Sequence, residues 1–311
     1  MNPATAPQIS IVIPSFNSGE YIDEALDSAL AQTGVTTEVI VVDDGSSDDT
    51  VAKVKAYGDR VRLIEQANQG SAVARNRGVA EAQADFIAFL DADDYWHPQK
   101  LARQWAAVER GAALVYARFT LWQALPDGRF PPALAYLTDS QAAGRMSKPA
   151  RHGWLYIDLL LDCEVWTSTV LARKDLLNKV GGFDVSLRKG QDYDLWLKLA
   201  NEAEWHGVSE SLALYRIHDQ NITRSVKADN FEYRILSNAY RRWGLGNRDG
   251  RQLPSSVMQA RLARSARTFA DAHLAARSGS IAAAYYRVSL THKPLAPRVW
   301  LNWLRARLLG G

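Results

Sequence analysis

The chain has 311 residues, 47% of them hydrophobic and 23% charged, which is the balance of a soluble globular protein able to bury a full core. Its single cysteine, Cys163, excludes an internal disulfide framework, and no apolar run approaches the roughly 18 residues of a membrane span. The net charge of +3 conceals an asymmetry: residues 1–230 hold 23 Lys and Arg against 31 Asp and Glu, whereas residues 231–311 hold 14 against 3.

Strand-like and helix-like segments alternate through the first half of the chain, as is typical of βαβ units and a mostly parallel sheet. The expected strands are residues 9–14, 38–42, 60–65 and 86–90. The expected helices are residues 20–32, a segment that ends near Tyr57, and residues 71–83 and 98–110. This alternation predicts an α/β protein with a Rossmann-like, mostly parallel sheet flanked by helices.

The second half is less regular. Residues 126–153 contain Pro, Gly and little periodicity, so we expect a long loop there. The expected elements around and after it are strands at 112–124, 166–171 and 213–216, a helix at 191–201, and a helical hairpin at 258–278 and 281–290. The predicted organisation is therefore an α/β domain at 1–230 followed by a basic helical extension at 231–311.

Three carboxylates follow a buried strand within four positions. The apolar run Phe86–Leu90 ends at Asp91, Asp93 and Asp94, and open α/β sheets bind ligands at the carboxyl ends of their strands. Like charges this close repel, and a divalent cation that prefers oxygen ligands, such as Mg²⁺ or Mn²⁺, would relieve the repulsion and could hold a diphosphate. The alternative is a polar turn between strand and helix, capped by Asp94.

Five motifs stand in a fixed order along the chain. They are Ser10–Asn17 (SIVIPSFN), Val41–Thr50 (VVDDGSSDDT), Asn68–Gly78 (NQGSAVARNRG), Asp91–Asp94 (DADD), and Gly181–Asp184 (GGFD) with Gln191–Trp196 (QDYDLW). In this order they resemble the family 2 glycosyltransferases over roughly residues 9–225. The resemblance implies a GT-A fold, with a nucleotide-sugar half at about 1–115 and an acceptor half at about 116–230. It also implies inversion at the anomeric centre and a divalent metal cofactor, Mn²⁺ or Mg²⁺.

The resemblance places Pro14, Phe16 and Asn17 beside the nucleotide, in the turn after the first strand. Asp43, at the end of the second strand, matches the carboxylate that contacts the nucleoside, and a carboxylate there can accept hydrogen bonds from a base or a ribose hydroxyl. The alternative for Asp43 is an Asx turn before Gly45.

Four further residues receive roles from the same resemblance. Arg75 is expected to contact the base or a phosphate, the alternative being a solvated surface arginine. Asp91 is expected to face the ribose or the shell of the metal, and Asp93 to ligate the metal. His218 is expected to ligate the metal or touch the diphosphate; its alternative is a structural role.

Asp192 is the expected general base, which takes the proton of the acceptor hydroxyl as that oxygen attacks the anomeric carbon. The family usually carries Glu-Asp here, whereas this chain has Gln191 before Asp192. The missing charge removes one like-charge contribution to the pKa of the base. The alternative is that Asp192 caps the helix beginning at Tyr193.

The C-terminal segment 299–309 mixes Trp, Leu and Arg, as interfacial helices do. With the basic charge of the tail, it predicts peripheral contact with the inner face of the cytoplasmic membrane; the alternative is a helix that packs back on the protein. Residues 1–8 lack the basic and apolar regions of a signal peptide, so a cytoplasmic location is expected. No nucleic-acid module is recognisable, and no nucleic-acid partner is expected.

Together these features predict an inverting, metal-dependent glycosyltransferase. The donor is a nucleotide-sugar, in this family mostly a UDP-sugar, and the acceptor is a hydroxyl of a glycan or lipid-linked saccharide in surface polysaccharide, lipopolysaccharide or glycolipid assembly. A non-catalytic scaffold that keeps the nucleotide-binding fold is the alternative. A nicotinamide-dependent oxidoreductase is rejected, because Pro14–Gly19 (PSFNSG) stands where its Gly-x-Gly-x-x-Gly turn would be.

Overall fold

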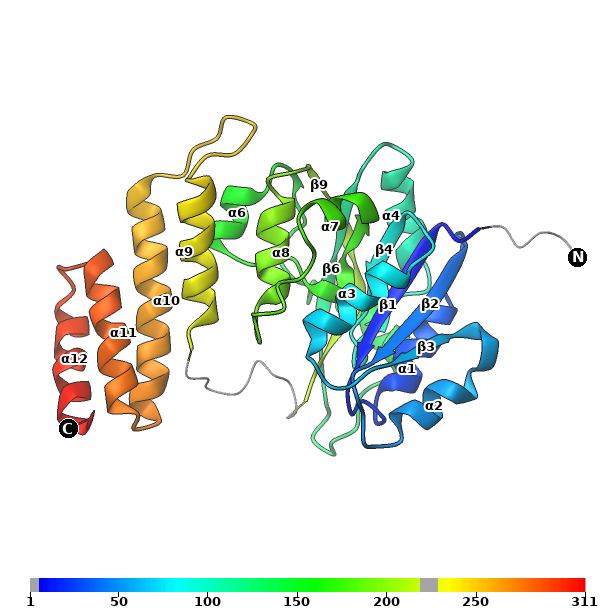
Figure 1. Ribbon diagram of the computed structural model, residues 1–311, viewed down its shortest axis with the longest axis horizontal. Helices are drawn as coiled ribbons and strands as arrows, with labels where there is room; N and C mark the ends of the chain where they lie inside the picture. Colours follow the sequence, from blue (N-terminus) through cyan, green and yellow to red (C-terminus); the bar gives the residue numbers. More distant parts are fainter. Residues whose placement is uncertain (1–5, 219–228, 311) are drawn as a thin grey trace, which may run out of the picture. The chain divides into compact units, whose positions relative to one another are not determined.

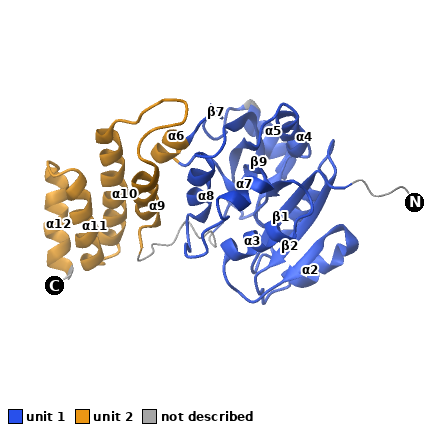
Figure 2. Cartoon of the chain, turned by 45° about the horizontal axis from the view of Figure 1, so that its top comes forward, with its two compact units in different colours: residues 1–155, 163–219 blue, residues 156–162, 220–311 orange. Residues whose placement is uncertain are grey.

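The computed structural model describes residues 6–218 and 229–310. Contacts divide the chain into two compact units, the first made of residues 1–155 and 163–219, the second of residues 156–162 and 220–311 (Figure 2). The expected division at residue 230 differs from this one by about ten residues. It also leaves in the first domain a short segment, 156–162, that belongs with the helical unit.

The first unit is built on one nine-stranded sheet with strand order β3-β2-β1-β4-β8-β6-β9-β5, and β7 pairs with β9 (Figure 1). The strands are β1 (Ile9–Ser15), β2 (Thr37–Asp43), β3 (Arg62–Glu65), β4 (Phe86–Phe89), β5 (Tyr95–Trp96), β6 (Leu114–Gln123), β7 (His152–Gly153), β8 (Leu171–Arg173) and β9 (Trp205–Ile217). Strands β1 to β4 are parallel, β8 is antiparallel to β4 and β6, and β6 is parallel to β9. The carboxyl ends of β1, β2 and β4 therefore meet at one edge.

Helices flank this sheet because its central strands are apolar on both faces. They are α1 (Ile22–Leu30), α2 (Thr50–Ala56), α3 (Ser71–Glu81), α4 (Lys100–Val108), α5 (Ala133–Ala142), α7 (Lys174–Lys179) and α8 (Gln191–Leu199), with 3₁₀ turns η1 (Gly58–Arg60) and η2 (Thr167–Thr169). All seven residues of β1 are buried. Helix α3 packs closely on β1 at Gly78, where an added Cβ would meet Val12 Cγ1 at 2.4 Å. This packing fixes α3, which begins just after the edge where the parallel strands end.

Two expectations for the second half of the first unit are wrong, and a third is confirmed but too short. Residues 126–153 are not one long loop, because they contain α5, whose Ala133 and Leu137 pack with Trp122 and Leu214. The strand expected at 166–171 is the turn η2 followed by β8. The strand expected at 213–216 is confirmed, but it is only the end of β9, which has 13 residues. In each case pairing or packing with distant residues decides the element, and no short sequence window contains that information.

The second unit is helical, as expected, but larger than a hairpin. It contains α6 (Tyr156–Leu161), α9 (Phe231–Trp243), α10 (Ser255–Ala275), α11 (Gly279–His292) and α12 (Pro297–Gly310). A small apolar core joins the last three of these helices, formed by Ala270, Ala282, Tyr286, Leu290, Val299 and Ala306. Among the described residues, no helix is both long and apolar enough to cross a membrane.

Candidate active site

Asn17 joins the loops that follow β1 and β2. Its backbone N–H donates to Ser46 Oγ at 2.8 Å, and its side-chain Oδ1 accepts from the backbone N–H of Ser47 at 2.8 Å. The φ of +49° at Asn17 lies in the left-handed region, which asparagine tolerates better than most residues. Nearby, an added Cβ on Gly19 would meet Asp49 Oδ1 at 1.9 Å. The two loops therefore form one interlocked surface.

Asp43 ends β2 and is buried. Its carboxylate accepts hydrogen bonds from the backbone N–H of Ser46 at 2.9 Å and of Gly45 at 3.2 Å, and from the Ser46 hydroxyl. This is the Asx-type turn that stood as the alternative to a binding role. A carboxylate offers about four lone-pair sites, so Asp43 retains capacity for one more donor. The neighbouring Asp44 accepts from the backbone N–H of Gly70 at 2.7 Å and so holds the start of α3.

Arg75 and Asp91 form a buried ion pair. Nη2 of Arg75 donates to Asp91 Oδ1 at 2.6 Å, and the guanidinium carbon lies 5.4 Å from the ring centroid of Phe183. Burial lowers the pKa of Arg75, but the charges of Asp91 and Asp192 raise it above its usual value. Burial raises the pKa of Asp91, the charges of Asp93 and Asp192 add to that rise, and Arg75 opposes it. These mutual effects place Asp91, Asp93, Asp192 and Arg75 within one electrostatic neighbourhood.

Asp93 and His218 are in direct contact. Nε2 of His218 lies 2.9 Å from Asp93 Oδ2, and the imidazole packs on Tyr21 with ring centroids 4.7 Å apart. A carboxylate oxygen and an imidazole nitrogen suit Mn²⁺. Asp91, the third expected ligand, is paired with Arg75 instead, and within residues 6–218 and 229–310 no group of three or more His, Cys, Asp or Glu side chains is arranged to hold a metal. The donor set thus fits an ion that takes its remaining oxygens from a diphosphate and water.

Asp94 supports the turn that carries these carboxylates. Its carboxylate is buried and accepts hydrogen bonds from Trp166 Nε1 at 3.0 Å, from the Ser168 hydroxyl, and from the backbone N–H of Arg216 at 3.2 Å. Burial, and then the charges of Asp93 and Asp91, raise the pKa of Asp94 well above its usual value. Ser168 Oγ also accepts from the backbone N–H of Asp91 at 3.0 Å, so one hydroxyl positions two members of the cluster.

Arg216 is a site residue that the sequence analysis missed. Its Nε donates to the backbone carbonyl of Asp93 at 2.8 Å, and its Nη2 lies 2.5 Å from Glu24 Oε2. The guanidinium also lies 4.0 Å from the ring centroid of Trp122 and 4.5 Å from that of Phe130. The only signal for it was its position two residues before His218. Through its hydrogen bonds to the Asp93 carbonyl and the Asp94 carboxylate, Arg216 holds the aspartate turn in place.

Asp192 lies in the first turn of α8 and is not its N-cap, which is Gly190 with φ +75°. Thr167 Oγ1 donates to Asp192 Oδ2 at 3.1 Å. The adjacent Gln191 donates from Nε2 to Ser71 Oγ at 2.7 Å, tying α8 to the first residue of α3. The residue that departs from the family pattern therefore connects the helix of the expected base to the helix of Arg75.

The structure thus brings most of the predicted site residues to one edge of the sheet. Four of them converge on the aspartate turn, namely Arg75, Asp91, Asp93 and His218. Asp192 is linked to that group through η2, where Thr167 donates to Asp192 and Ser168 accepts from the backbone N–H of Asp91. Pro14 lies within β1 opposite Val42, and Phe16 is half exposed beside Asn17. Beyond Arg216, the residues missed from sequence are the hydroxyls of Thr167 and Ser168, whose roles depend on a 3₁₀ turn that was expected to be a strand.

Comparison with known proteins identifies the class of this site. The model of glycosyl transferase family 2 matches residues 10–156. The succinoglycan biosynthesis protein ExoO of Rhizobium meliloti is 33% identical over 246 residues, which are 76% of this chain and 69% of ExoO.

Two solved structures show the same fold. TarS of S. aureus (residues 1–349) in complex with UDP-GlcNAc superposes with a TM-score of 0.64 at 18% identity, covering 97% of this chain and 88% of that one. The mannosyltransferase PcManGT of Pyrobaculum calidifontis, in complex with GDP-Man and Mn²⁺, superposes with a TM-score of 0.59 at 17% identity. The match covers 99% of this chain and 87% of that one.

The chain belongs to the family 2 glycosyltransferases and has the GT-A fold. It is therefore an enzyme of the glycosyltransferase class, with a relative in polysaccharide biosynthesis. The family assignment, the fold and the enzyme class predicted from the sequence are confirmed.

Proposed function

We propose that this protein transfers a sugar, with inversion and with the help of a divalent metal, from a UDP-sugar to a hydroxyl of a glycan or lipid-linked saccharide. The acceptor would belong to surface polysaccharide, lipopolysaccharide or glycolipid assembly. The observation that carries the proposal is the cluster at the carboxyl edge of the sheet, made of the Arg75–Asp91 pair and the Asp93–His218 contact. Asp192 joins it through Thr167, whose neighbour Ser168 accepts from the backbone N–H of Asp91.

Asp192 is the proposed general base. Its carboxylate takes the proton of the acceptor hydroxyl, the hydroxyl oxygen forms a bond to the anomeric carbon, and the bond from that carbon to the diphosphate oxygen breaks. Thr167 supports this role, because its hydroxyl donates to Asp192 Oδ2 at 3.1 Å and so orients the carboxylate. Asp192 is partly exposed, as a base that meets an incoming acceptor must be.

The nucleotide is proposed to lie along the edge lined by Pro14, Phe16, Asn17, Asp43 and Arg75, with Asp91 near the ribose. The exposed ring of Phe16 offers a face on which a base can stack. The remaining acceptor capacity of Asp43 suits a base N–H or a ribose hydroxyl. UDP is favoured because TarS, a structural neighbour, binds UDP-GlcNAc.

The metal site is proposed at Asp93 and His218, with Asp91 contributing once the diphosphate competes for Arg75. When bound, Mn²⁺ or Mg²⁺ would neutralise charge that develops on the departing diphosphate. The Asp93–His218 contact at 2.9 Å and the Mn²⁺ complex of PcManGT support this assignment. Arg216, which donates to the Asp93 carbonyl, would keep the Asp93 carboxylate in place.

Calorimetric titration with UDP, dTDP and GDP, with and without Mn²⁺, tests the donor site. Binding of one nucleotide that depends on Mn²⁺ is the expected result. Absence of binding by all three in a folded protein would favour the alternative, a scaffold that keeps the fold without the reaction.

We further propose that the exposed face of α12 contacts an anionic membrane surface. Trp300, Leu301, Leu304 and Leu308 recur on one side of the helix and are 45%, 51%, 52% and 85% exposed, while Val299 and Ala306 pack inward. Residues 231–311 carry 14 Lys and Arg against 3 Asp and Glu, which complements anionic lipid.

Flotation with anionic vesicles tests the membrane contact. Leu304→Gln with Leu308→Gln should weaken vesicle binding by about tenfold or more, because two apolar side chains would no longer enter the interface. Leu125→Gln with Val185→Gln, two exposed apolar residues of the first unit, is the matched control. Equal binding by both double variants and the wild type would remove α12 from membrane attachment.

A further inference from the structure

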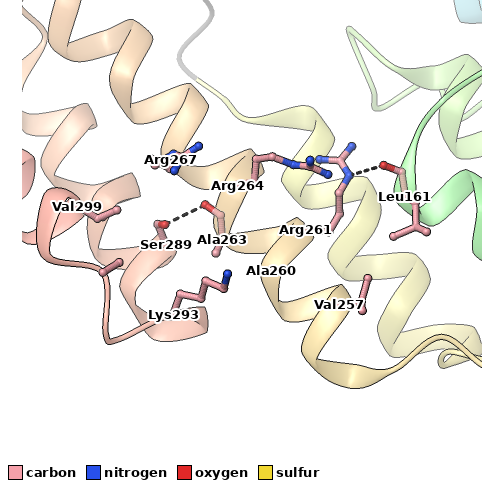
Figure 3. Close-up of a pocket in the computed structure, with 11 residues that line it drawn as sticks. Leu161, Val257, Ala260, Arg261, Ala263, Arg264, Arg267, Ser289, Lys293 and Val299 are labelled. Carbon is pink, nitrogen blue, oxygen red and sulfur yellow. Dashed lines mark hydrogen bonds between the residues drawn. The ribbon is translucent and has the colours of Figure 1, made fainter.

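The helical unit contains a pocket of about 390 Å³ between α10, α11 and the start of α12 (Figure 3). Its uncharged lining residues are small or apolar, namely Leu161, Val257, Ala260, Ala263, Ser289, Ala296 and Val299. Its charged residues are all basic, namely Arg261, Arg264, Arg267 and Lys293. A volume of this size suits a small ligand.

The three arginines that line the pocket all lie on α10. Arg261, Arg264 and Arg267 follow one another at intervals of three residues, so their charges are neighbours on the helix surface and repel. Arg261 is buried and compensated, because it donates to the Leu161 carbonyl at 2.9 Å and to Glu232 at 2.5 Å. It therefore forms a fixed wall of the pocket.

The other basic groups are weakly compensated. Arg267 comes no closer than 3.9 Å to Asp271, an exposed pair worth little in water. Arg264 and Lys293 are exposed, and neither has an ion-pair partner among residues 229–310. Burial raises the pKa of Glu232, but Arg261, then the Ser265 hydroxyl and the more distant charge of Arg264, lower it below its usual value. The ion-pair partner of this carboxylate is Arg261, and Arg264 only contributes to its electrostatic surroundings. The rim keeps a net positive charge.

The floor of the pocket offers little polar competition. Ser289 Oγ donates to the carbonyl of Ala263 at 2.8 Å, and the remaining floor residues present methyl groups. A ligand that fits must therefore carry a compact, multiply charged anion for the rim and a carbon portion for the floor. Phosphate esters have this form, and guanidinium groups bind phosphate oxygens in a forked geometry.

We propose that this pocket binds the phosphate or diphosphate group of an ester, with Arg264, Arg267 and Lys293 as the anion contacts. The bound anion relieves the repulsion along α10. The site lies within the helical unit, so the proposal stands independently of the transfer reaction and of its metal.

The first experiment is calorimetry of the full chain with sodium diphosphate in EDTA, which removes any metal-dependent binding at Asp93. Saturable binding is expected. Arg264→Gln with Lys293→Gln should weaken it by about tenfold or more, because two charge-assisted contacts are lost. The control, Arg241→Gln with Arg287→Gln, removes the same charge from exposed positions that do not line the pocket.

A second arm separates the two sources of a phosphate ester. Binding to vesicles of phosphatidylcholine with phosphatidic acid, lost in Arg264→Gln/Lys293→Gln and retained in the control, would assign the pocket to a lipid headgroup. Diphosphate binding without pocket-dependent vesicle binding would assign it to a soluble ester. Thermal melting with and without diphosphate reports folding and binding of each variant together.

Two results would overturn the proposal. One is a wild-type protein that binds no diphosphate in EDTA. The other is an equal loss of binding in the pocket variant and in the control, since that would make the effect one of net charge. Arg267→Gln provides an independent variant, which should also weaken binding.

Discussion

The acidic site of the first unit and the basic pocket of the second differ in how their charges are balanced. Asp91 forms an ion pair with Arg75 and Asp93 contacts His218, whereas Arg264 on the pocket rim has no ion-pair partner in the described part of the helical unit. Where side chains of a site are held by contacts with one another, they need little rearrangement when a reaction takes place. A site left unbalanced gains its stability from a ligand. Under the two proposals above, the first unit carries the transfer site and the second unit binds a charged ligand.

The largest effect on the first unit is expected at the proposed base. Asp192→Asn should lower turnover by about 10²- to 10⁴-fold, because the amide cannot accept the acceptor proton, while donor binding is retained. Turnover and nucleotide affinity are measured on the same preparation. Asp194→Asn, two residues along α8 in an ion pair with Lys198, is the control. A turnover near that of the wild type would remove Asp192 from the mechanism.

The next largest effect is expected from substitution of the proposed metal ligands. Asp93→Ala should abolish the Mn²⁺-dependent part of nucleotide binding, a loss of about 10- to 100-fold in affinity, because the ion loses a carboxylate ligand. His218→Ala should reproduce part of this loss. The exposed Asp59→Ala serves as control. Unchanged affinity with Mn²⁺ in both site variants would return Asp93 and His218 to a structural role.

Ser168 tests whether the acidic site depends on its internal hydrogen bonds. Ser168→Ala removes the hydroxyl that serves both Asp91 and Asp94, and should lower the free energy of unfolding by about 1–3 kcal/mol. Urea unfolding measures the change. Ser140 is the matched control, because its hydroxyl is buried without a hydrogen-bond partner in the described residues. An equal effect of Ser140→Ala would contradict a special role for Ser168.

The last prediction is a trend of stability with pH, and it concerns Lys100, which is fully buried, donates to Gln104 at 2.8 Å and lies 3.8 Å from the ring centroid of Trp96. Burial lowers its pKa well below the usual value. Between that lowered pKa and about 10.4, the unfolded chain binds more protons than the folded one, so this group makes stability rise with pH.

Lys100→Met should remove that pH dependence. Urea unfolding is measured between pH 6 and 10. As pH rises, the free energy of unfolding of the variant should fall relative to that of the wild type, by about 1.4 kcal/mol for each unit by which the pKa of Lys100 is lowered. The exposed Lys55→Met is the control. The same trend in Lys55→Met would show that the burial of Lys100 is not the cause.

The sequence predicted the nucleotide-binding half of the fold well, because its strands are apolar runs that end at turn residues. The strands ending near Pro14, Asp43 and Leu90 all have this form, and the motifs at their ends give the site residues directly. In this half, local sequence pattern and tertiary structure agree, so the sequence pattern alone is enough to predict the strands and helices.

The acceptor half was predicted less well because its elements depend on distant partners. Helix α5 has little amphipathic pattern. It is stabilised by the packing of Leu137 against Trp122 and Leu214. Arg216 could not be recognised, since a buried arginine is identified only by its partners, here Glu24 and the Asp93 carbonyl.

The interlocked loops after β1 and β2 have a consequence for engineering donor preference. Asn17 bonds to Ser46 and Ser47, and Gly19 leaves no room for a side chain beside Asp49. A graft of residues 15–19 from a relative would separate these contacts unless residues 45–50 moved with it. The two segments therefore have to be exchanged together, and chimeras that exchange only one of them should have a less stable edge where the nucleotide is proposed to bind.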